Sequence, residues 1–466
     1  MTFLAILILL IAHYFSGSGL LYLFRVKLKP AMQITLSIIC GIVILSLVPL
    51  FLELAFIPLT LTSIAAGIAV ICVLLNLTKL ANIKSVLSDS KWRFPSIKAY
   101  EIPFFVLFSI MFFSSLWRSF YLPSNARDML SGPEVIADYA VKEHSLINSV
   151  LTVNLESTNN HLKPPFILGL QVIYKFFGIE FGGVWVGFMS VCFCIFLYNV
   201  LREKMHGVIA GLLLLLFIAL PEVYAYSYMM LFDYSNMVLY FLGVYFMLRY
   251  FKSGLQSEIY FSAVLFGFST IIRLETLVLI AMMVPLLWLY SYQKKAAIKN
   301  VVLQSFAIMA VSGFFYFLWM NIFLNYYMPG LITVESQLNK NLIDLSPLFK
   351  RFSEMNSELL FGRLEEPLWA HFIKVFLAVM VLDLVISRKM SRESLNWLYA
   401  LAVVYFGLPI LGYLLPLMDL NNTTKRALFK LMPIALLLMA NTGILIKLSA
   451  KLLDWENGNE ENRVGR

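Results

Sequence analysis

Long apolar runs, separated by short polar segments, dominate this chain. Many runs extend for roughly 20 residues with almost no charged side chain, which is the length of helix that crosses a bilayer core of about 30 Å. The strict alternation of a membrane β-barrel is not seen in the sequence. We therefore predict an all-α polytopic membrane protein with about 13 transmembrane helices and with juxtamembrane helices in its first large loop. The predicted spans lie near residues 3–24, 31–51, 56–78, 101–120, 183–201, 207–226, 231–250, 258–272, 274–292, 299–324, 369–387, 396–416 and 427–447.

Clusters of Lys and Arg between the runs predict which helix ends face the cytoplasm. Membrane proteins concentrate these cations in cytoplasmic loops. If every cluster is cytoplasmic, the N-terminus lies outside and the C-terminus inside, and residues 1–24 form a first span rather than a signal peptide. The clusters are Arg25, Lys27 and Lys29; Lys79, Lys84, Lys91, Arg93 and Lys98; Arg202 and Lys204; Arg249 and Lys252; Lys294, Lys295 and Lys299; Arg388, Lys389 and Arg392; and Lys447, Lys451, Arg463 and Arg466.

The apolar stretch 164–178 decides this topology. It holds too few residues for a comfortable span, and it contains Lys175. If it did span, Arg202 and Lys204 would lie outside and every later loop would be inverted. We therefore expect it to form a short helix that lies on the membrane surface.

Two long loops then fall on the outer side, about residues 121–182 and about residues 325–368. Loops of this length in a compact protein are usually functional. We divide the chain into an N-terminal three-helix extension (1–99), a transmembrane module (100–450) and a cytoplasmic tail (451–466). About a dozen residues at the end of the tail are expected to fray, because they are rich in Glu, Asn and Gly.

The composition is typical of a membrane protein and argues against a soluble domain or a nucleic-acid-binding protein. Of the 466 residues, 60% are hydrophobic and only 14% are charged, against about 25% charged in soluble domains. Cytoplasmic loops explain the net charge of +9, so we expect no nucleic-acid partner. The four cysteines lie inside apolar runs and are expected to be core residues: Cys40, Cys72, Cys192 and Cys194.

The first long loop contains signals for two short helices. Ser131-Gly132-Pro133-Glu134 has the spacing of a capping box and predicts a surface helix that continues to about Ile147. A polar run follows, and Lys163-Pro164-Pro165 then opens the apolar stretch, because proline favours a helix start. The loop therefore combines an acid at the membrane, two juxtamembrane helices and a Lys-Pro-Pro motif.

These features resemble the GT-C superfamily of membrane glycosyltransferases, in particular the bacterial branch related to protein mannosyltransferases and the lipid A aminoarabinose transferase. That branch places an acidic residue just after a span, then juxtamembrane helices, then a Lys-Pro-Pro motif that opens a short apolar helix ending in Phe-Gly. The resemblance covers about residues 100–450. The similar motifs here are Asp128, Lys163-Pro164-Pro165-Phe166, Phe176-Phe177-Gly178, Arg273-Leu274-Glu275, and Lys425-Arg426-Ala427 through Pro433.

The chain also departs from that pattern. Three predicted spans precede the loop where typical relatives have one, and no second acid follows Asp128 until Glu134. Which acid is the base, and whether a metal binds, are therefore left open. The sequence shows no metal-ligand spacing among His, Cys and carboxylates and no glycine-rich nucleotide loop, so we predict no firm cofactor; a divalent metal is possible but has no support.

The resemblance implies a hexosyl- or pentosyltransferase that moves a sugar from a polyprenyl-phosphate-linked donor to a lipid, glycan or protein acceptor. The reaction would take place at the outer face of the bacterial inner (cytoplasmic) membrane. Asp128 is the expected general base, since a positioned carboxylate can take the acceptor proton. The expected ligands of the donor phosphate are Lys163, Arg426 and Arg127. The residues expected to line or support the substrate site are Glu134, His161, Asp233, Arg273 and Glu275.

Simpler interpretations of these residues stay open. Asp128 also suits a solvated loop acid or a helix cap, and Glu134 a capping residue. Lys163 and Arg426 also suit contacts with lipid headgroups. For the whole chain, the alternatives are an oligosaccharide ligase or polymerase that uses a diphosphate-linked donor, and a lipid or sugar transporter or flippase.

Overall fold

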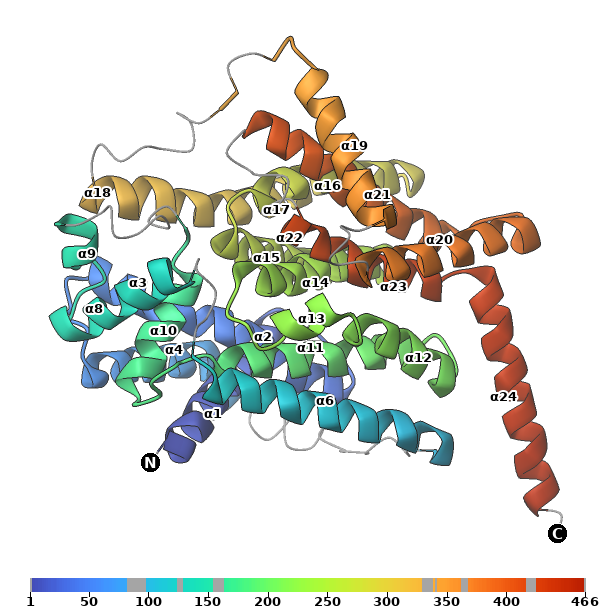
Figure 1. Ribbon diagram of the computed structural model, residues 1–466, viewed down its shortest axis with the longest axis horizontal. Helices are drawn as coiled ribbons and strands as arrows, with labels where there is room; N and C mark the ends of the chain where they lie inside the picture. Colours follow the sequence, from blue (N-terminus) through green and yellow to red (C-terminus); the bar gives the residue numbers. More distant parts are fainter. Residues whose placement is uncertain are drawn as a thin grey trace.

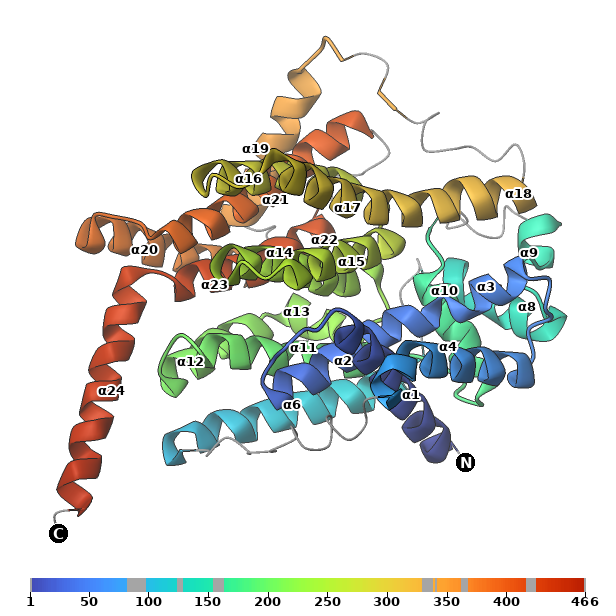
Figure 2. The same cartoon turned by 180° about the vertical axis from the view of Figure 1, so that it is seen from behind.

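The structure is a computed structural model that describes residues 2–81, 98–123, 129–153, 163–328, 338–339, 342–361, 368–415 and 425–464. Every regular element in these ranges is a helix (Figures 1 and 2). Eight of the described helices are long and apolar enough to cross a membrane, or nine if one bent pair counts as a single span. The prediction of a polytopic helical membrane protein is confirmed, and the count of about 13 spans stays a prediction.

The N-terminal helices pack tightly on one another and on the rest of the bundle. Glycines bring α1 and α2 together: a Cβ at Gly17 would collide with the carbonyl of Ser37, and a Cβ at Gly41 with that of His13. Helix α2 also packs against α10 and α11, so the first helices share a core with the module that follows. The bounds are α1 Thr2–Leu23, α2 Pro30–Ser46, α3 Val48–Leu54 and α4 Leu61–Ala81.

The middle of the chain forms the centre of the bundle around α14. Nearly every side chain of α14 is buried, and it packs against α15 as well as α11 and α21. The predicted span 207–226 is divided between α12 and α13, because Pro221 begins a new helix. The bounds are η1 Ala99–Glu101, α6 Ile102–Tyr121, α11 Val184–Arg202, α12 Gly207–Ile218, α13 Pro221–Tyr226, α14 Phe232–Ser253, α15 Gln256–Ile272, α16 Thr276–Gln293, α17 Ile298–Phe317, η4 Leu318–Leu324 and α18 Asn325–Tyr327.

The first long loop differs from its prediction in two ways. The helical turn begins before the predicted cap: Ser131 lies inside η2, which starts at Leu130, and the carboxylate of Glu134 pairs with Lys175. The helix also ends at Glu143, because His144 adopts a left-handed conformation with φ 60°. The bounds are η2 Leu130–Glu134, α8 Val135–Glu143, α9 Ser149–Thr152 and α10 Phe166–Phe176.

Helix α10 is short, as predicted, but it does not lie on an open membrane surface. Its 11 residues span about 16 Å, too little to cross a bilayer. Its residues from Phe166 to Tyr174 are buried by protein, against α2, α3 and α8. A Cβ at Gly169 would collide with the carbonyl of Ser46 on α2, so the two helices touch through their backbones.

The C-terminal part of the chain bends sharply. The predicted span 427–447 is bent, because the helix from Leu428 to Ala440 and the helix from Gly443 to Asn457 meet at an angle of 58°. Helix α24 continues to Val464 (Figure 1), and the fraying expected for the tail stays a prediction. The bounds are α19 Ser346–Phe361, α20 Leu368–Ser387, α21 Arg392–Leu414, α22 Lys425–Ala427, η7 Leu428–Lys430, α23 Leu431–Ala440 and α24 Gly443–Val464.

The two ends of α14 define two ends of the molecule. We call the end with Asp233 the loop end and the end with Arg249 the basic end. The helix has 22 residues, so these ends are about 33 Å apart. Arg249 donates to the carbonyl of Lys27, and Lys29 pairs with Glu203 at 3.1 Å, so predicted cytoplasmic clusters meet at the basic end.

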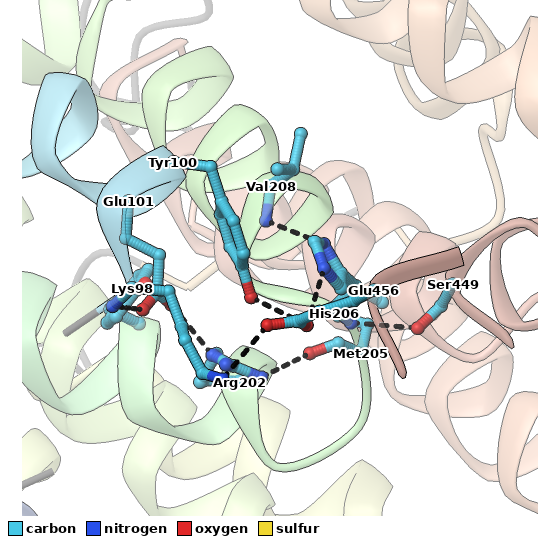
Figure 3. A network of polar contacts seen from close by, with 10 residues as sticks. Lys98, Tyr100, Glu101, Arg202, Met205, His206, Val208, Ser449 and Glu456 are labelled. Carbon is cyan, nitrogen blue, oxygen red and sulfur yellow. Dashed lines mark hydrogen bonds and ion pairs between the residues drawn. The ribbon is translucent and has the colours of Figure 1, made fainter. Parts of the chain in front are cut away.

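Glu456 and Ser449 hold helix α24 against other helices at the basic end. Figure 3 shows Glu456 beside Lys98, Tyr100 and His206. Its oxygens lie 3.1 Å from Lys98 Nζ and 3.3 Å from His206 Nε2, and accept a hydrogen bond of 3.0 Å from Tyr100. Ser449, also on α24, accepts a hydrogen bond of 2.8 Å from the backbone N–H of His206. The bent helix is therefore bound to the starts of α6 and α12.

Candidate functional site

A buried carboxylate between two guanidinium groups lies at the loop end of α14. Asp233 is in the first turn of that helix, where the helix dipole favours negative charge, and it is only 1% exposed. Its Oδ1 accepts a hydrogen bond of 2.6 Å from Arg273, and its Oδ2 is 3.7 Å from Nε of Arg426. Asp233 thus joins the α15–α16 turn to the C-terminal helices.

Arg273 lies in the turn between α15 and α16 and binds two carboxylates. The chain leaves α15 at Arg273 in an extended conformation, which directs the side chain toward α14. Its second nitrogen donates to Glu275 at 2.9 Å. Burial alone would lower the pKa of Arg273, but the charges of Asp233 and Glu275 outweigh it and raise the pKa. The guanidinium is therefore always charged.

Two further cations come from the helical turns that precede α23. Arg426 lies in α22 and contacts Asp233, as described above. Lys430 lies one turn later in η7 and is 2% exposed, with Asp233, Arg273 and Glu275 as its charged neighbours. Within the described residues its ammonium group makes no hydrogen bond or ion pair. A buried ammonium group without hydrogen-bond acceptors destabilises the fold unless a ligand or a water molecule accepts its hydrogen bonds.

The Lys-Pro-Pro motif reaches the same place from the first long loop. Lys163 directly precedes the two prolines and α10, and its Nζ is 5.2 Å from the centre of the Phe232 ring. Phe232 directly precedes Asp233, so Lys163 lies at the same end of α14 as the buried ion pairs. We define the Asp233 cluster as Lys163, Asp233, Arg273, Glu275, Arg426 and Lys430.

The Asp233 cluster carries more positive than negative charge. It holds four cations and two carboxylates, and Asp233, Arg273 and Lys430 are all at most 8% exposed. Buried charge is stable only when it is paired and hydrogen-bonded. Nε of Arg273 has no hydrogen-bond partner in the described part of the chain. The cluster is therefore suited to hold an anion, and a phosphate carries one to two negative charges.

The structure gives Glu134 a different partner. Its carboxylate is 2.7 Å from Nζ of Lys175, which also contacts Asp138 at 2.7 Å. Burial lowers the pKa of Lys175, but the hydrogen bonds to Asp138 and Glu134 raise it by more. This ion-pair network fastens α8 to α10, which is a structural task for a residue that the sequence proposed as a second acid.

Three predicted site residues, Arg127, Asp128 and His161, lie outside the described residues. Of the others, Lys163, Asp233, Arg273, Glu275 and Arg426 come together. Among described residues, no group of three or more His, Cys, Asp or Glu side chains could hold a metal ion.

Lys430 was missed by the sequence reasoning. The available signal was a single lysine within an apolar run, since ionisable residues at such positions usually serve a site.

Comparison with protein-family models, with curated proteins and with solved structures finds no match for this chain. Any statement about function therefore depends on the motifs of the sequence and on the geometry of the Asp233 cluster.

Proposed function

We propose that this protein is a glycosyltransferase that uses a polyprenyl-phosphate-linked sugar. The observation that carries the proposal is the buried Lys430 ammonium, which makes no hydrogen bond within the described residues and lies beside Arg273, whose Nε also has no hydrogen-bond partner there. The Asp233 cluster lies at the end of membrane-sized helices, where the phosphate of a lipid-linked donor would be found while its tail stays in the bilayer. Arg273, Arg426, Lys163 and Lys430 would hold that phosphate.

The proposed reaction moves one sugar and one proton. The acceptor oxygen attacks the anomeric carbon of the sugar, and the bond from that carbon to the phosphate oxygen breaks. Asp128 takes the acceptor proton. The polyprenyl phosphate leaves with one more negative charge than it had in the donor, so cations aimed at its oxygens stabilise the transition state more than the ground state.

The proposed orientation puts the basic end in the cytoplasm. The loop end then faces the outer side of the bacterial inner membrane, with the N-terminus outside and the C-terminus inside, because cations favour cytoplasmic loops. The acceptor would be a lipid, a glycan or a protein that reaches this face.

The orientation can be tested with single cysteines in a cysteine-free background. Lys142, on the exposed face of α8, and Lys294, in the turn after α16, lie at opposite ends of the bundle. We expect a membrane-impermeant maleimide added to intact cells to label the cysteine at position 142 and not that at 294. The reverse result would invert the proposed topology.

Transfer should be assayed in liposomes with a panel of polyprenyl-phosphate sugars, comparing the wild type with Asp128→Asn. We expect the variant to unfold at the wild-type temperature and to transfer at least about 100-fold more slowly, because the amide keeps the shape but cannot accept the proton. Glu180→Gln, at an exposed acid of the same loop, is the matched control and should lower transfer less than about threefold. Near-normal turnover by Asp128→Asn would reject Asp128 as the base. Absence of transfer from every donor by folded wild type would count against the proposed function itself.

A further inference from the structure

A second charged site, separate from the Asp233 cluster, lies at the basic end. An open cavity of about 650 Å³ is lined by the α1–α2 turn, the ends of α11 and α14, and the start of α21. We call it the basic cavity. Five cations line it: Lys27, Lys29, Lys204, Arg249 and Lys252.

The carboxylates near the basic cavity do not balance these cations. Glu203 is 3.1 Å from Lys29, and Glu258 is 2.7 Å from Arg249. Glu393 is shared, since it pairs with Lys204 and is 2.5 Å from Lys252. Within the described residues, three carboxylates therefore pair with four of the five cations, and the ammonium of Lys27 makes no ion pair. Two positive charges are left for an anion.

The wall of the basic cavity also offers an unused hydrogen-bond donor. Trp397 lines the cavity, is 2% exposed, and its indole Nε1 has no acceptor among the residues that the structure describes. Such buried donors are rare unless a ligand or water meets them. The ring of Trp397 stacks on Phe241 with centroids 6.0 Å apart, so it is held in place by packing.

We propose that the basic cavity binds the phosphate headgroup of an anionic membrane lipid. Basic pockets between transmembrane helices suit such headgroups, and each nearby cation contributes on the order of 1 kcal/mol. Leu28, Leu248 and Trp397 supply an apolar wall that a lipid can cover and a small phosphate cannot. A soluble phosphate shares the anionic group, and the experiment below separates the two sources.

The experiment measures lipid retained by the full-length protein. Purified protein is exchanged into detergent with phosphatidylglycerol or with zwitterionic phosphatidylcholine, and bound lipid is counted by native mass spectrometry. We expect saturable binding of phosphatidylglycerol only. The double variant Lys27→Gln with Lys252→Gln changes two exposed side chains and should weaken this binding at least tenfold. The matched control is Lys294→Gln with Lys295→Gln, two exposed lysines at the same end that do not line the cavity.

A variant with the opposite expected sign excludes an effect of damaged folding. Glu203→Gln removes the partner of Lys29 and should strengthen phosphatidylglycerol binding about fivefold. Equal binding by wild type and by the Lys27 and Lys252 double variant would overturn the proposal. Binding of inorganic phosphate in the absence of lipid, lost in the same double variant, would also overturn it and would assign the cavity to a soluble anion.

Discussion

At the scale of single residues, Lys430 is the most informative side chain in the structure. It is almost fully buried, lies next to Arg273, and has no hydrogen-bond partner in the described part of the chain. Folding alone gains little from such a lysine, because its desolvation is unfavourable. A residue that is costly for folding at a candidate site is expected to serve binding.

Lys430→Met should therefore separate stability from activity. We expect the variant to unfold at the same temperature as wild type or above it, since methionine has a similar length and no charge. Transfer should fall about tenfold or more, because one ligand of the leaving phosphate is lost. Lys430→Arg should keep more activity than Lys430→Met, and Lys447→Met on exposed α24 should change neither property. Unchanged transfer by Lys430→Met would remove Lys430 from the site.

Arg273→Gln should instead destabilise the fold. The change leaves the buried carboxylate of Asp233 without its 2.6 Å partner. Removing one member of a buried pair costs about 3–5 kcal/mol, so the unfolding temperature should fall measurably. The double variant Arg273→Gln with Asp233→Asn should recover part of that loss, because no unpaired carboxylate is left. No recovery would contradict a direct coupling of the two residues.

Most residues of the Asp233 cluster were predicted from the sequence as site residues, but the sequence did not show that they lie close together. Lys163, Asp233, Arg273, Glu275 and Arg426 come from four separate elements, and spacing along the chain contains no information on contacts between them. Lys430 was missed because only its surroundings in space distinguish it from a lysine that reaches toward headgroups.

At the scale of elements, apolar runs predicted where the helices are but not what surrounds them. Side chains that face lipid and side chains that face protein are both apolar, so the burial of α10 could not be foreseen. The bend before α24 was also hidden, because Asn441 and Thr442 interrupt the apolar run only briefly. In the structure the backbone N–H of Ile444 donates to Asp383 at 2.9 Å, which satisfies the start of the new helix.

The contact between α10 and α2 can be tested by adding one methyl group. Gly169→Ala places a Cβ against the carbonyl of Ser46, so we expect a loss of about 1–3 kcal/mol and a lower unfolding temperature in detergent. Gly313→Ala is the control, since no heavy atom lies within 4 Å of the added Cβ. It should be neutral or stabilise by up to about 1 kcal/mol, as alanine favours a helix. Equal effects of both substitutions would rule out the close approach.

At the scale of the whole molecule, charged groups concentrate at the two ends of an apolar bundle. The Asp233 cluster lies at one end of α14, and the basic cavity and the Glu456 contacts lie at the other. Figure 2 shows α24 running across the direction of the other helices from this second end. The clusters of Lys and Arg predicted this polarity, whereas the attachment of α24 depends on Glu456, which resembles any other tail acid in the sequence.

Glu456→Gln should loosen α24 while the bundle stays folded. The substitution removes charge-assisted contacts to Lys98 and Tyr100, worth about 1–2 kcal/mol together. Hydrogen exchange of residues 443–457 should become on the order of tenfold faster, with little change in α14. Asp454→Asn, at an exposed position of the same helix, should leave exchange unchanged. Unaltered exchange in Glu456→Gln would show that α24 is held by other contacts.

The backbone contact between Gly169 and Ser46 has an evolutionary consequence. In a relative of this chain that keeps its first helices, we expect position 169 to stay glycine, because any side chain there would meet the backbone of α2. A lineage that lost those helices would be released from this constraint, and a bulkier residue would fill the vacated space. The residue at position 169 is therefore expected to change together with the presence or absence of the first helices.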